Sequence, residues 1–300
     1  MLVEGSISQL RSCCLCRQDN YQFLYRTRLS PGRVVQCRNC GLVYINPIEH
    51  PELLAAGDHD QAGDLMNATA PPVYPQIYLA EAKVKRKLYM KILGRIESVT
   101  GRAGTLLDVG SYLGLFMQAA ESRGWRCKGI EPERDAWQYA VQELGLDVCL
   151  GTLRKCTFSP QSFDAIILLQ VLEHVLDPRQ TLEQIYGLLR PNGVLFVEVP
   201  NIDCLSFRIL GKWHRHFAEH HFTFFTAKTL TALLSQCDFR VVSVSFPSRV
   251  TSIRLLSFGL SMWHPSLYKL VAPILSIKSL QNSVLSFNLR EVVSICAQAS

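Results

Sequence analysis

The fold is decided by the stretch Leu106-Leu107-Asp108-Val109-Gly110-Ser111-Tyr112-Leu113-Gly114. An apolar run leads into Gly110, where the absence of a side chain lets the backbone turn sharply and approach a ligand closely. Gly114 permits tight packing at the start of the next segment, whose apolar spacing is helical. A buried strand, a glycine turn and a helix in this order are typical of the start of a nucleotide-binding α/β domain. Glycines that serve packing alone are the alternative.

Strands and helices are expected to alternate on both sides of this stretch. The expected strands are residues 105–109, 125–130, 148–150, 165–169, 194–199, 239–246 and 292–296, and the expected helices are residues 76–99, 113–123, 134–144, 179–189 and 226–235. The run Ala165–Leu169 is apolar throughout, as a parallel sheet that is covered on both faces requires. The pattern therefore predicts an α/β fold with a doubly wound sheet.

Two acidic residues stand where a ligand of such a sheet would bind, at the carboxyl ends of the first two strands. Glu131 can accept hydrogen bonds from both hydroxyls of a ribose. Asp108 would repel a pyrophosphate, whereas it suits the cationic amino-acid end of S-adenosylmethionine. Tyr112 occupies the middle glycine position of the nicotinamide-cofactor fingerprint, and the sequence has no G-x-x-x-x-G-K-[ST] loop for ATP.

Four motifs in this region resemble those of class I S-adenosylmethionine-dependent methyltransferases, in the same order and at similar spacing. They are residues 108–114, 129–132, 163–178 and 188–201, so that the resemblance covers about residues 75 to 245. It implies an α/β fold with a Rossmann-like seven-stranded methyltransferase sheet and S-adenosylmethionine as the cofactor. The cofactor contacts that it implies are Asp108, Gly110 and Gly114 at the methionine part, Glu131 at the ribose, and Thr152, Leu153 and Gln170 around the adenine. Ser111 and Pro132 are expected as further contacts to the cofactor.

Two pairs of cysteines, Cys13-x-x-Cys16 and Cys37-x-x-Cys40, are separated by 20 residues. Four thiolates from two such turns form a closed tetrahedral zinc site, which is structural because no ligand position stays open. Cys14 could replace Cys13 in this set, and a group of buried free thiols is the alternative. The segment resembles the N-terminal zinc ribbon of sugar C-methyltransferases. Their additional C-terminal domain has no counterpart in this sequence, which leaves the acceptor open.

These patterns predict a division of the chain into a zinc ribbon over residues 1–50, a proline-containing linker over 51–75 and a methyltransferase domain over 76–300. An apolar insertion at about residues 248–287 interrupts the last part. We expect it to be a lid over the acceptor pocket, a contact between two copies of the chain, or an interfacial docking surface for a lipid-linked substrate.

The acceptor side carries two candidate groups for proton transfer. Glu173-His174 follows the fourth strand, and in the quinone O-methyltransferases that the chain resembles, a similar pair lies beside the acceptor. Acids there can hold a divalent metal, but Gln170 stands where a further acid would be expected, so we predict no metal at this place. His221 matches the histidine of the family's loop before the last helix and is the expected general base, with His220 as the neighbouring alternative. Capping and packing roles are the other interpretation of both groups.

Composition narrows the class of protein. The 300 residues are 48% hydrophobic with a net charge of +6, which permits an anionic partner without requiring one. There is no apolar run of about 18 residues and no export signal at the N-terminus. We therefore expect a cytoplasmic protein whose eleven cysteines are mostly thiols or metal ligands.

Three functions are compared on this basis. The first is a methyltransferase that acts on oxygen or carbon of a small molecule, such as a sugar, a secondary metabolite or a lipid-linked precursor. The second is a zinc-ribbon RNA methyltransferase, although Gln170-Val171-Leu172-Glu173 replaces the motif that base-methylating enzymes carry after the fourth strand. The third is a non-enzymatic interaction protein, against which the intact Asp108, Gly110 and Glu131 argue.

Overall fold

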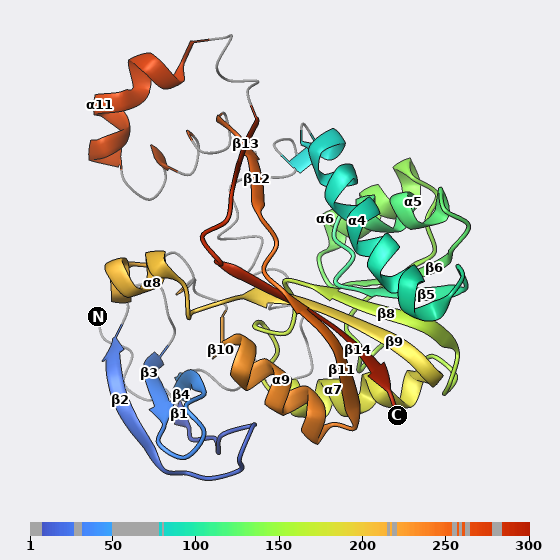
Figure 1. Cartoon of the computed structure of the whole chain (residues 1–300), viewed down its shortest axis with the longest axis horizontal. Helices are drawn as coiled ribbons and strands as arrows, with labels where there is room; N and C mark the ends of the chain where they lie inside the picture. Colours follow the sequence, from blue (N-terminus) through green and yellow to red (C-terminus); the bar gives the residue numbers. More distant parts are fainter. Residues whose placement is uncertain are drawn as a thin grey trace.

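The structure is a computed structural model, shown in Figure 1. It describes residues 8–26, 32–49, 78–79, 81–214, 217, 221–253, 257, 260–261, 265–277 and 284–300. The linker expected over residues 51–75 and the alternative base His220 lie outside the described residues.

A seven-stranded sheet forms the centre of the α/β part. Its strands, in spatial order, are β11 (Phe239–Ser245), β14 (Val292–Ala299), β9 (Leu189–Pro200), β8 (Phe163–Leu169), β5 (Thr105–Val109), β6 (Arg126–Glu131) and β7 (Val148–Leu150). All neighbours from β9 to β7 are parallel, and β14 runs antiparallel to both of its neighbours. After β7 the chain crosses to the other side of β5, so the topological switch point lies between β5 and β8. The Rossmann-like seven-stranded fold expected from the sequence is confirmed.

Helices cover both faces of this sheet (Figure 1). One face carries α4 (Ala82–Thr100), α5 (Leu115–Glu121) and α6 (Arg134–Gln138), and the other carries α7 (Pro178–Leu188) and α9 (Ala227–Gln236). Successive strand residues point to opposite faces, so Leu106 packs in the core beneath α4 and α5, and Leu107 packs in the core beneath α7 and α9. Both faces are covered, which explains why the central strands β5, β8 and β9 are largely apolar.

Most elements differ from the predicted bounds only at their ends, but two differ in their type or their start. The helix expected over residues 134–144 changes after Gln138 into the π-helical turn η1 (Tyr139–Glu143). Strand β9 begins at Leu189 rather than at Val194, because Asn192 adopts a left-handed φ of 63° and the chain bulges between the end of the expected helix and the start of the expected strand.

The N-terminal segment forms a separate antiparallel sheet with strand order β1 (Ser8–Gln9), β4 (Val43–Glu49), β3 (Gly32–Cys37) and β2 (Tyr21–Arg26). A fifth strand, β10 (Thr223–Phe224), comes from far along the chain and pairs with β4 on its free stretch, with Thr223 opposite Tyr44. Leu15, Val35 and Tyr44 share one buried cluster with the core beneath α7 and α9. The two sheets are therefore packed together, and the domain boundaries stated above stay a prediction.

The insertion between β11 and β14 is built on a two-stranded ladder of β12 (Arg249–Ser252) and β13 (Val284–Phe287). It carries α11 (Pro265–Leu275), which Figure 1 shows set apart from the seven-stranded sheet. Leu270 and Ile274 on α11 are 77% and 61% exposed. Among the described residues, no helix combines the length and apolar character needed to cross a membrane.

Candidate active site

The loop after β5 is shaped by two glycines. Gly110 has a φ of 76°, and a Cβ there would lie 2.6 Å from Cγ2 of Val171. Gly114 has a φ of 74°, and a Cβ there would lie 2.3 Å from Cδ1 of Leu146. Any other residue would be strained by the backbone and would collide with a neighbour. Both glycines are thus required by the fold, and at Gly110 the backbone comes close to the side chain of Val171.

Glu131 at the end of β6 holds this loop in place. Its Oε2 accepts a hydrogen bond from the N–H of Tyr112 at 2.6 Å, and its Oε1 accepts one from the N–H of Glu133 at 2.8 Å. A carboxylate has about four acceptor positions, so two of them are left for a ligand. Burial raises the pKa of Glu131 to about 7. The arrangement is suited to accept two hydroxyl groups.

Asp108 is a buried acid that faces the same loop. Its side chain is 2% exposed, and burial together with the charge of Glu131 raises its pKa to about 8. A buried carboxylate next to a second one is stabilised by a cationic ligand. Within the described part of the chain, the hydroxyls of Ser111 and Thr152 are also buried without a hydrogen-bond partner. These unsatisfied polar groups fit a ligand that has hydroxyls and a positively charged end.

The far side of the loop region is formed by residues after β7 and β8. The N–H of Gly151 donates to the carbonyl of Glu131 at 2.9 Å, which brings the neighbouring Thr152 and Leu153 toward the loop. Pro132 follows directly after β6. Gln170 follows β8 with a left-handed φ of 59° and donates its N–H to the carbonyl of Glu198 at 2.8 Å. The predicted cofactor contacts therefore gather at the carboxyl ends of β5, β6, β7 and β8.

A disulfide between Cys149 and Cys156 closes the loop that carries Thr152 and Leu153. The cysteine content predicted mostly thiols or metal ligands, and this bond is the exception among the described residues. The remaining nine cysteines form no disulfide.

Three groups on the acceptor side come together from distant parts of the chain. One ligand atom each of Glu173, His174 and His221 lies within 4.8 Å of the others, and the two imidazole rings meet edge to face with centroids 4.5 Å apart. The carbonyl of Glu173 accepts hydrogen bonds from the N–H groups of Phe222 at 2.8 Å and of Thr223 at 3.3 Å. These bonds join the loop after β8 to the loop before β10.

Glu173 is the most deeply buried member of this group. Its side chain is 2% exposed, and no other described residue donates a hydrogen bond to its carboxylate oxygens. Burial raises its pKa to about 8, with a smaller contribution from the charge of Glu198. The three groups are suited to accept and hold a proton, and their spacing would also admit a metal ion. The expectation that Gln170 prevents metal binding there stays a prediction.

The four predicted zinc ligands also lie together. Cys13 Sγ is 3.4 Å from Cys40 Sγ, Cys16 Sγ is 3.3 Å from Cys37 Sγ, and all four sulfurs lie within 4.8 Å of one another. Sulfurs bound tetrahedrally to one zinc at about 2.3 Å are about 3.8 Å apart, so the donor set and its dimensions fit this metal. Cys14 is not a member of the cluster, which favours Cys13 as the ligand.

Residues 80–244, more than half of the chain, match the model of a family described as a methyltransferase domain. The chain belongs to this methyltransferase family.

Individual relatives agree with this assignment. The chain is 24% identical to a ubiquinone biosynthesis O-methyltransferase of Coxiella burnetii, over 56% of this chain and 71% of that protein. It is 31% identical to a protein of the same name from Idiomarina loihiensis, over 44% of this chain and 57% of that protein. The solved structure of a putative methyltransferase from Bacillus halodurans has the same fold, with a TM-score of 0.51 and 12% identity over 69% of this chain and 98% of that one. The protein is an S-adenosylmethionine-dependent methyltransferase.

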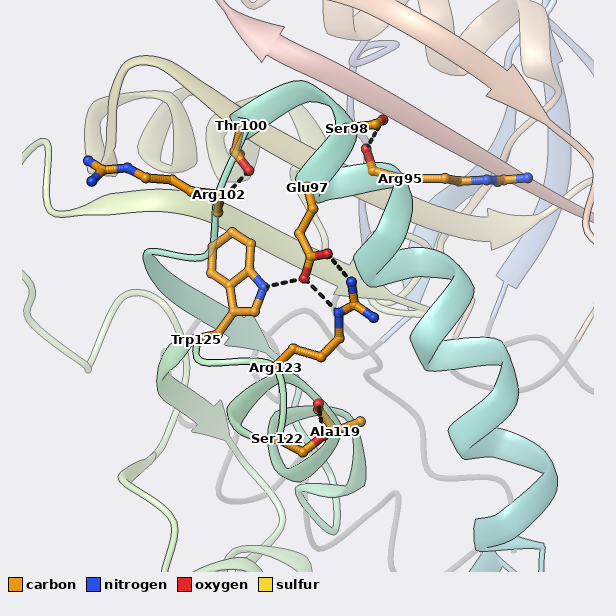
Figure 2. A network of polar contacts seen from close by, with 9 residues as sticks. All are labelled: Arg95, Glu97, Ser98, Thr100, Arg102, Ala119, Ser122, Arg123 and Trp125. Carbon is orange, nitrogen blue, oxygen red and sulfur yellow. Dashed lines mark hydrogen bonds and ion pairs between the residues drawn. The ribbon is translucent and has the colours of Figure 1, made fainter.

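The opposite end of the sheet carries a polar network that serves the methyltransferase fold. Figure 2 shows that Arg123 and Trp125 both donate to the carboxylate of Glu97 on α4, the indole at 3.1 Å. A surface hollow beside it is lined by Glu97, Gly101, Arg102, Ala103 and Arg123. These residues lie at the amino end of β5, whereas ligands of parallel sheets bind at the carboxyl ends. The network therefore fixes α4 on the sheet and is not part of the cofactor site.

We expect reduction of the Cys149–Cys156 disulfide to weaken S-adenosylmethionine binding by about 3- to 10-fold. The loop carries the predicted adenine contacts Thr152 and Leu153, and a freed loop would lose conformational entropy on binding the cofactor. Calorimetry with and without dithiothreitol measures the effect. The variant with Cys149→Ser and Cys156→Ser should bind like the reduced protein and show no response to the reductant. Equal affinities of oxidised and reduced protein would show that the disulfide has no part in cofactor binding.

Proposed function

We propose that this methyltransferase transfers a methyl group to an oxygen, or to an activated carbon, of a small acceptor that binds beside Glu173, His174 and His221. The observation that carries the proposal is the meeting of these three groups next to the carboxyl end of β8, where Gln170 lies. Methyl transfer from a sulfonium is an in-line displacement, so most of the catalysis consists of positioning in a site that excludes water. A hydroxyl acceptor additionally needs a group that takes up its proton.

Different residues of the chain would bind different parts of the cofactor. Asp108 would pair with the ammonium group of S-adenosylmethionine, Glu131 would accept the ribose hydroxyls, and Gly110 would leave room for the cofactor against the backbone. Ser111 and Gly114 would complete the methionine side, Pro132 would lie beside the ribose, and Thr152, Leu153 and Gln170 would border the adenine. When bound, S-adenosylmethionine supplies the electrophilic methyl group. The unsatisfied hydroxyls of Ser111 and Thr152 support this assignment.

The acceptor side would handle the proton. His221 is the proposed base that takes the proton from an acceptor hydroxyl, and His174 contacts its ring edge to face. The buried Glu173, whose raised pKa of about 8 lets it exchange a proton near neutral pH, would receive or balance that proton. The names of the relatives support an oxygen acceptor. A sugar, a secondary metabolite and a lipid-linked precursor all agree with this chemistry.

We also propose a structural zinc ion on Cys13, Cys16, Cys37 and Cys40. Thiolates fill all four positions of a tetrahedral ion, so it would activate no water or substrate. The exposed apolar side chains of α11 support a role for the insertion as a contact between two copies or as an interfacial surface toward a lipid-linked acceptor. The cytoplasmic location expected from the sequence stays a prediction.

The proposal is tested with methyl-labelled S-adenosylmethionine and a panel of acceptors that includes hydroxylated aromatics, nucleotide sugars and RNA. With the acceptor that is methylated, His221→Ala should lower turnover by about 100- to 1000-fold, because general-base catalysis contributes on this scale. The affinity for S-adenosylmethionine, measured by calorimetry, should stay within about twofold.

The neighbouring residue supplies the control. His220→Ala should retain turnover, and if it loses turnover while His221→Ala does not, the base assignment moves by one residue. Retained turnover in both variants would refute a histidine base in this loop. Methylation of RNA alone would favour the RNA methyltransferase alternative.

A further inference from the structure

Arg11 makes contacts that the functions described so far do not explain. Its guanidinium donates hydrogen bonds to the carbonyls of three separate segments: from Nε to Ile45 at 3.0 Å, from Nη1 to Leu176 at 2.7 Å, and from Nη2 to Phe222. The fork of an arginine has five N–H donors in a fixed plane, so one side chain can hold three acceptors in a defined arrangement.

The three segments are the ribbon and the two loops of the acceptor side. Ile45 lies on β4 of the N-terminal sheet. Leu176 follows Glu173-His174 by two residues, and Phe222 is the residue next to His221. A single planar group therefore connects the cysteine-containing ribbon to both loops that carry the proposed proton-transfer groups.

Arg11 is itself held rigidly. Its N–H donates to Oδ1 of Asn46 at 3.0 Å, Nδ2 of Asn46 donates back to the carbonyl of Arg11 at 3.1 Å, and its guanidinium lies 5.1 Å from the centre of the Tyr44 ring. The carbonyl of Phe222 also accepts a hydrogen bond from the N–H of Ile45 at 3.0 Å. The loop before β10 is thus fixed to the ribbon twice, by a side chain and by the backbone.

Taking this cation partly out of water is costly. The hydrogen bonds that the structure describes from its guanidinium go to neutral groups, the three carbonyls and the hydroxyl of Thr223, rather than to a carboxylate. Backbone pairing between β4 and β10 would already join the two sheets. The carbonyl of Glu173 already joins the loop after β8 to the loop before β10 through the N–H groups of Phe222 and Thr223. The additional contribution of Arg11 is the bond to Leu176, which fixes the loop after β8 to the ribbon at a second point, two residues beyond His174.

We infer that Arg11 is a positioning residue, which holds Glu173-His174 and His221 at their working separation and makes the geometry of the acceptor site depend on the ribbon. This inference rests on the proposed function for the role of the three groups, but the geometry can be tested without it. The ribbon would then be a part of the catalytic unit and not an appended module.

A second arginine provides a matched control. Arg179 on α7 donates from Nε to the carbonyl of Cys14 and from Nη2 to the carbonyl of Leu15, both at 2.8 Å. It therefore fixes the ribbon to the α/β part, as Arg11 does, but it contacts neither acceptor-side loop in the bonds that the structure describes. If a substitution lowers turnover only because it loosens the ribbon, substitutions of Arg11 and of Arg179 should lower turnover to the same extent.

The test compares Arg11→Gln and Arg179→Gln in the full chain, with labelled histidine observed by NMR. The imidazole protons of His174 and His221 should give a mutual NOE in the wild type, because the ring centroids are 4.5 Å apart. We expect this NOE to be lost in Arg11→Gln and kept in Arg179→Gln, with S-adenosylmethionine affinity within about twofold in both. With an acceptor in hand, turnover of Arg11→Gln should fall by about 10- to 100-fold, with a changed pH profile.

The outcomes separate the two proposals. An NOE that persists in Arg11→Gln, or that is lost equally in both variants, overturns the positioning role. If the NOE is lost in Arg11→Gln but His221→Ala retains turnover, the positioning role stands and the base assignment fails.

If Arg11→Gln does not fold, the variant Arg11→Lys provides the test, because an ammonium keeps the charge but cannot span three carbonyls. An NOE and turnover at the wild-type level in Arg11→Lys would overturn the inference.

Discussion

Replacing Glu131 with glutamine should weaken S-adenosylmethionine binding by about 100-fold. Glutamine keeps one acceptor oxygen, but its NH₂ group cannot accept the backbone N–H that the second carboxylate oxygen accepts from Tyr112 or Glu133. The variant therefore loses acceptor positions for the ribose and leaves a backbone donor unpaired. Hydrogen bonds to a charged group contribute about 1.5–3 kcal/mol, and a tenfold change in affinity corresponds to about 1.4 kcal/mol. Isothermal titration calorimetry measures the loss.

The same residue should give the binding a pH dependence. Burial raises the pKa of Glu131 to about 7 in the free protein, so below this pH the carboxyl must release a proton before it can accept two hydroxyls. Affinity of the wild type should therefore rise between about pH 6 and pH 8. The ratio of wild-type to Glu131→Gln affinity should rise over the same range, since titration of the cofactor affects both proteins equally.

The adjacent acid is the control for this prediction. Only the backbone N–H of Glu133 is bonded to Glu131, so Glu133→Gln should bind S-adenosylmethionine within about twofold of the wild type. Equal losses in the two variants would point to a general effect of negative charge. Wild-type affinity in Glu131→Gln would remove Glu131 from the cofactor site.

The elements of the α/β part could be predicted because each follows a local rule. The strand Phe163–Leu169 is largely apolar because both faces of the sheet are covered. Helix α7 begins where Asp177 accepts a hydrogen bond from the N–H of Gln180 at 3.0 Å and a proline follows. The start of β9 was misplaced because the left-handed conformation of Asn192 depends on its neighbours in the sheet.

The link between the two sheets could not be predicted from any local pattern. Strand β10 has two residues, too few to show a periodicity, and its partner β4 lies about 180 positions earlier in the chain. Arg11 bonds to carbonyls that are 165 and 211 positions away, and nothing in its sequence surroundings marks it as different from an exposed arginine.

The residues of the candidate site likewise divide into those that the sequence identifies and those whose arrangement only the structure shows. Asp108, Gly110 and Glu131 could be found from their positions at the ends of two strands. His221 and Glu173 were found through the resemblance, but the backbone bonds that bring their loops together are visible only in the structure. Glu198 was missed, although an acid inside the buried strand β9 is an unusual feature that could have marked it.

Replacing Cys37 with serine should abolish stoichiometric zinc binding and lower the melting temperature of the whole chain by about 10 °C or more. Structural zinc contributes about 10–16 kcal/mol to small domains at neutral pH, and the loss of one thiolate removes a large part of this. About 1 kcal/mol corresponds to 2–4 °C in proteins of this size range. The effect should reach the α/β part, because Cys13 and Cys37 belong to the same buried cluster as the core beneath α7 and α9. Metal analysis and differential scanning calorimetry measure the two quantities.

The Cys14→Ser variant is the control for this prediction. Cys14 lies next to Cys13 in the chain but outside the group of four sulfurs, so Cys14→Ser should keep about one zinc per chain and shift the melting temperature much less than Cys37→Ser does. Zinc loss in Cys14→Ser with retention in Cys13→Ser would exchange the two cysteines as ligands. A single cooperative transition in Cys37→Ser, lowered as a whole, is expected if the ribbon and the sheet unfold together. Two separate transitions, with the second at the wild-type temperature, would instead show that the ribbon unfolds on its own and that its metal does not stabilise the catalytic part.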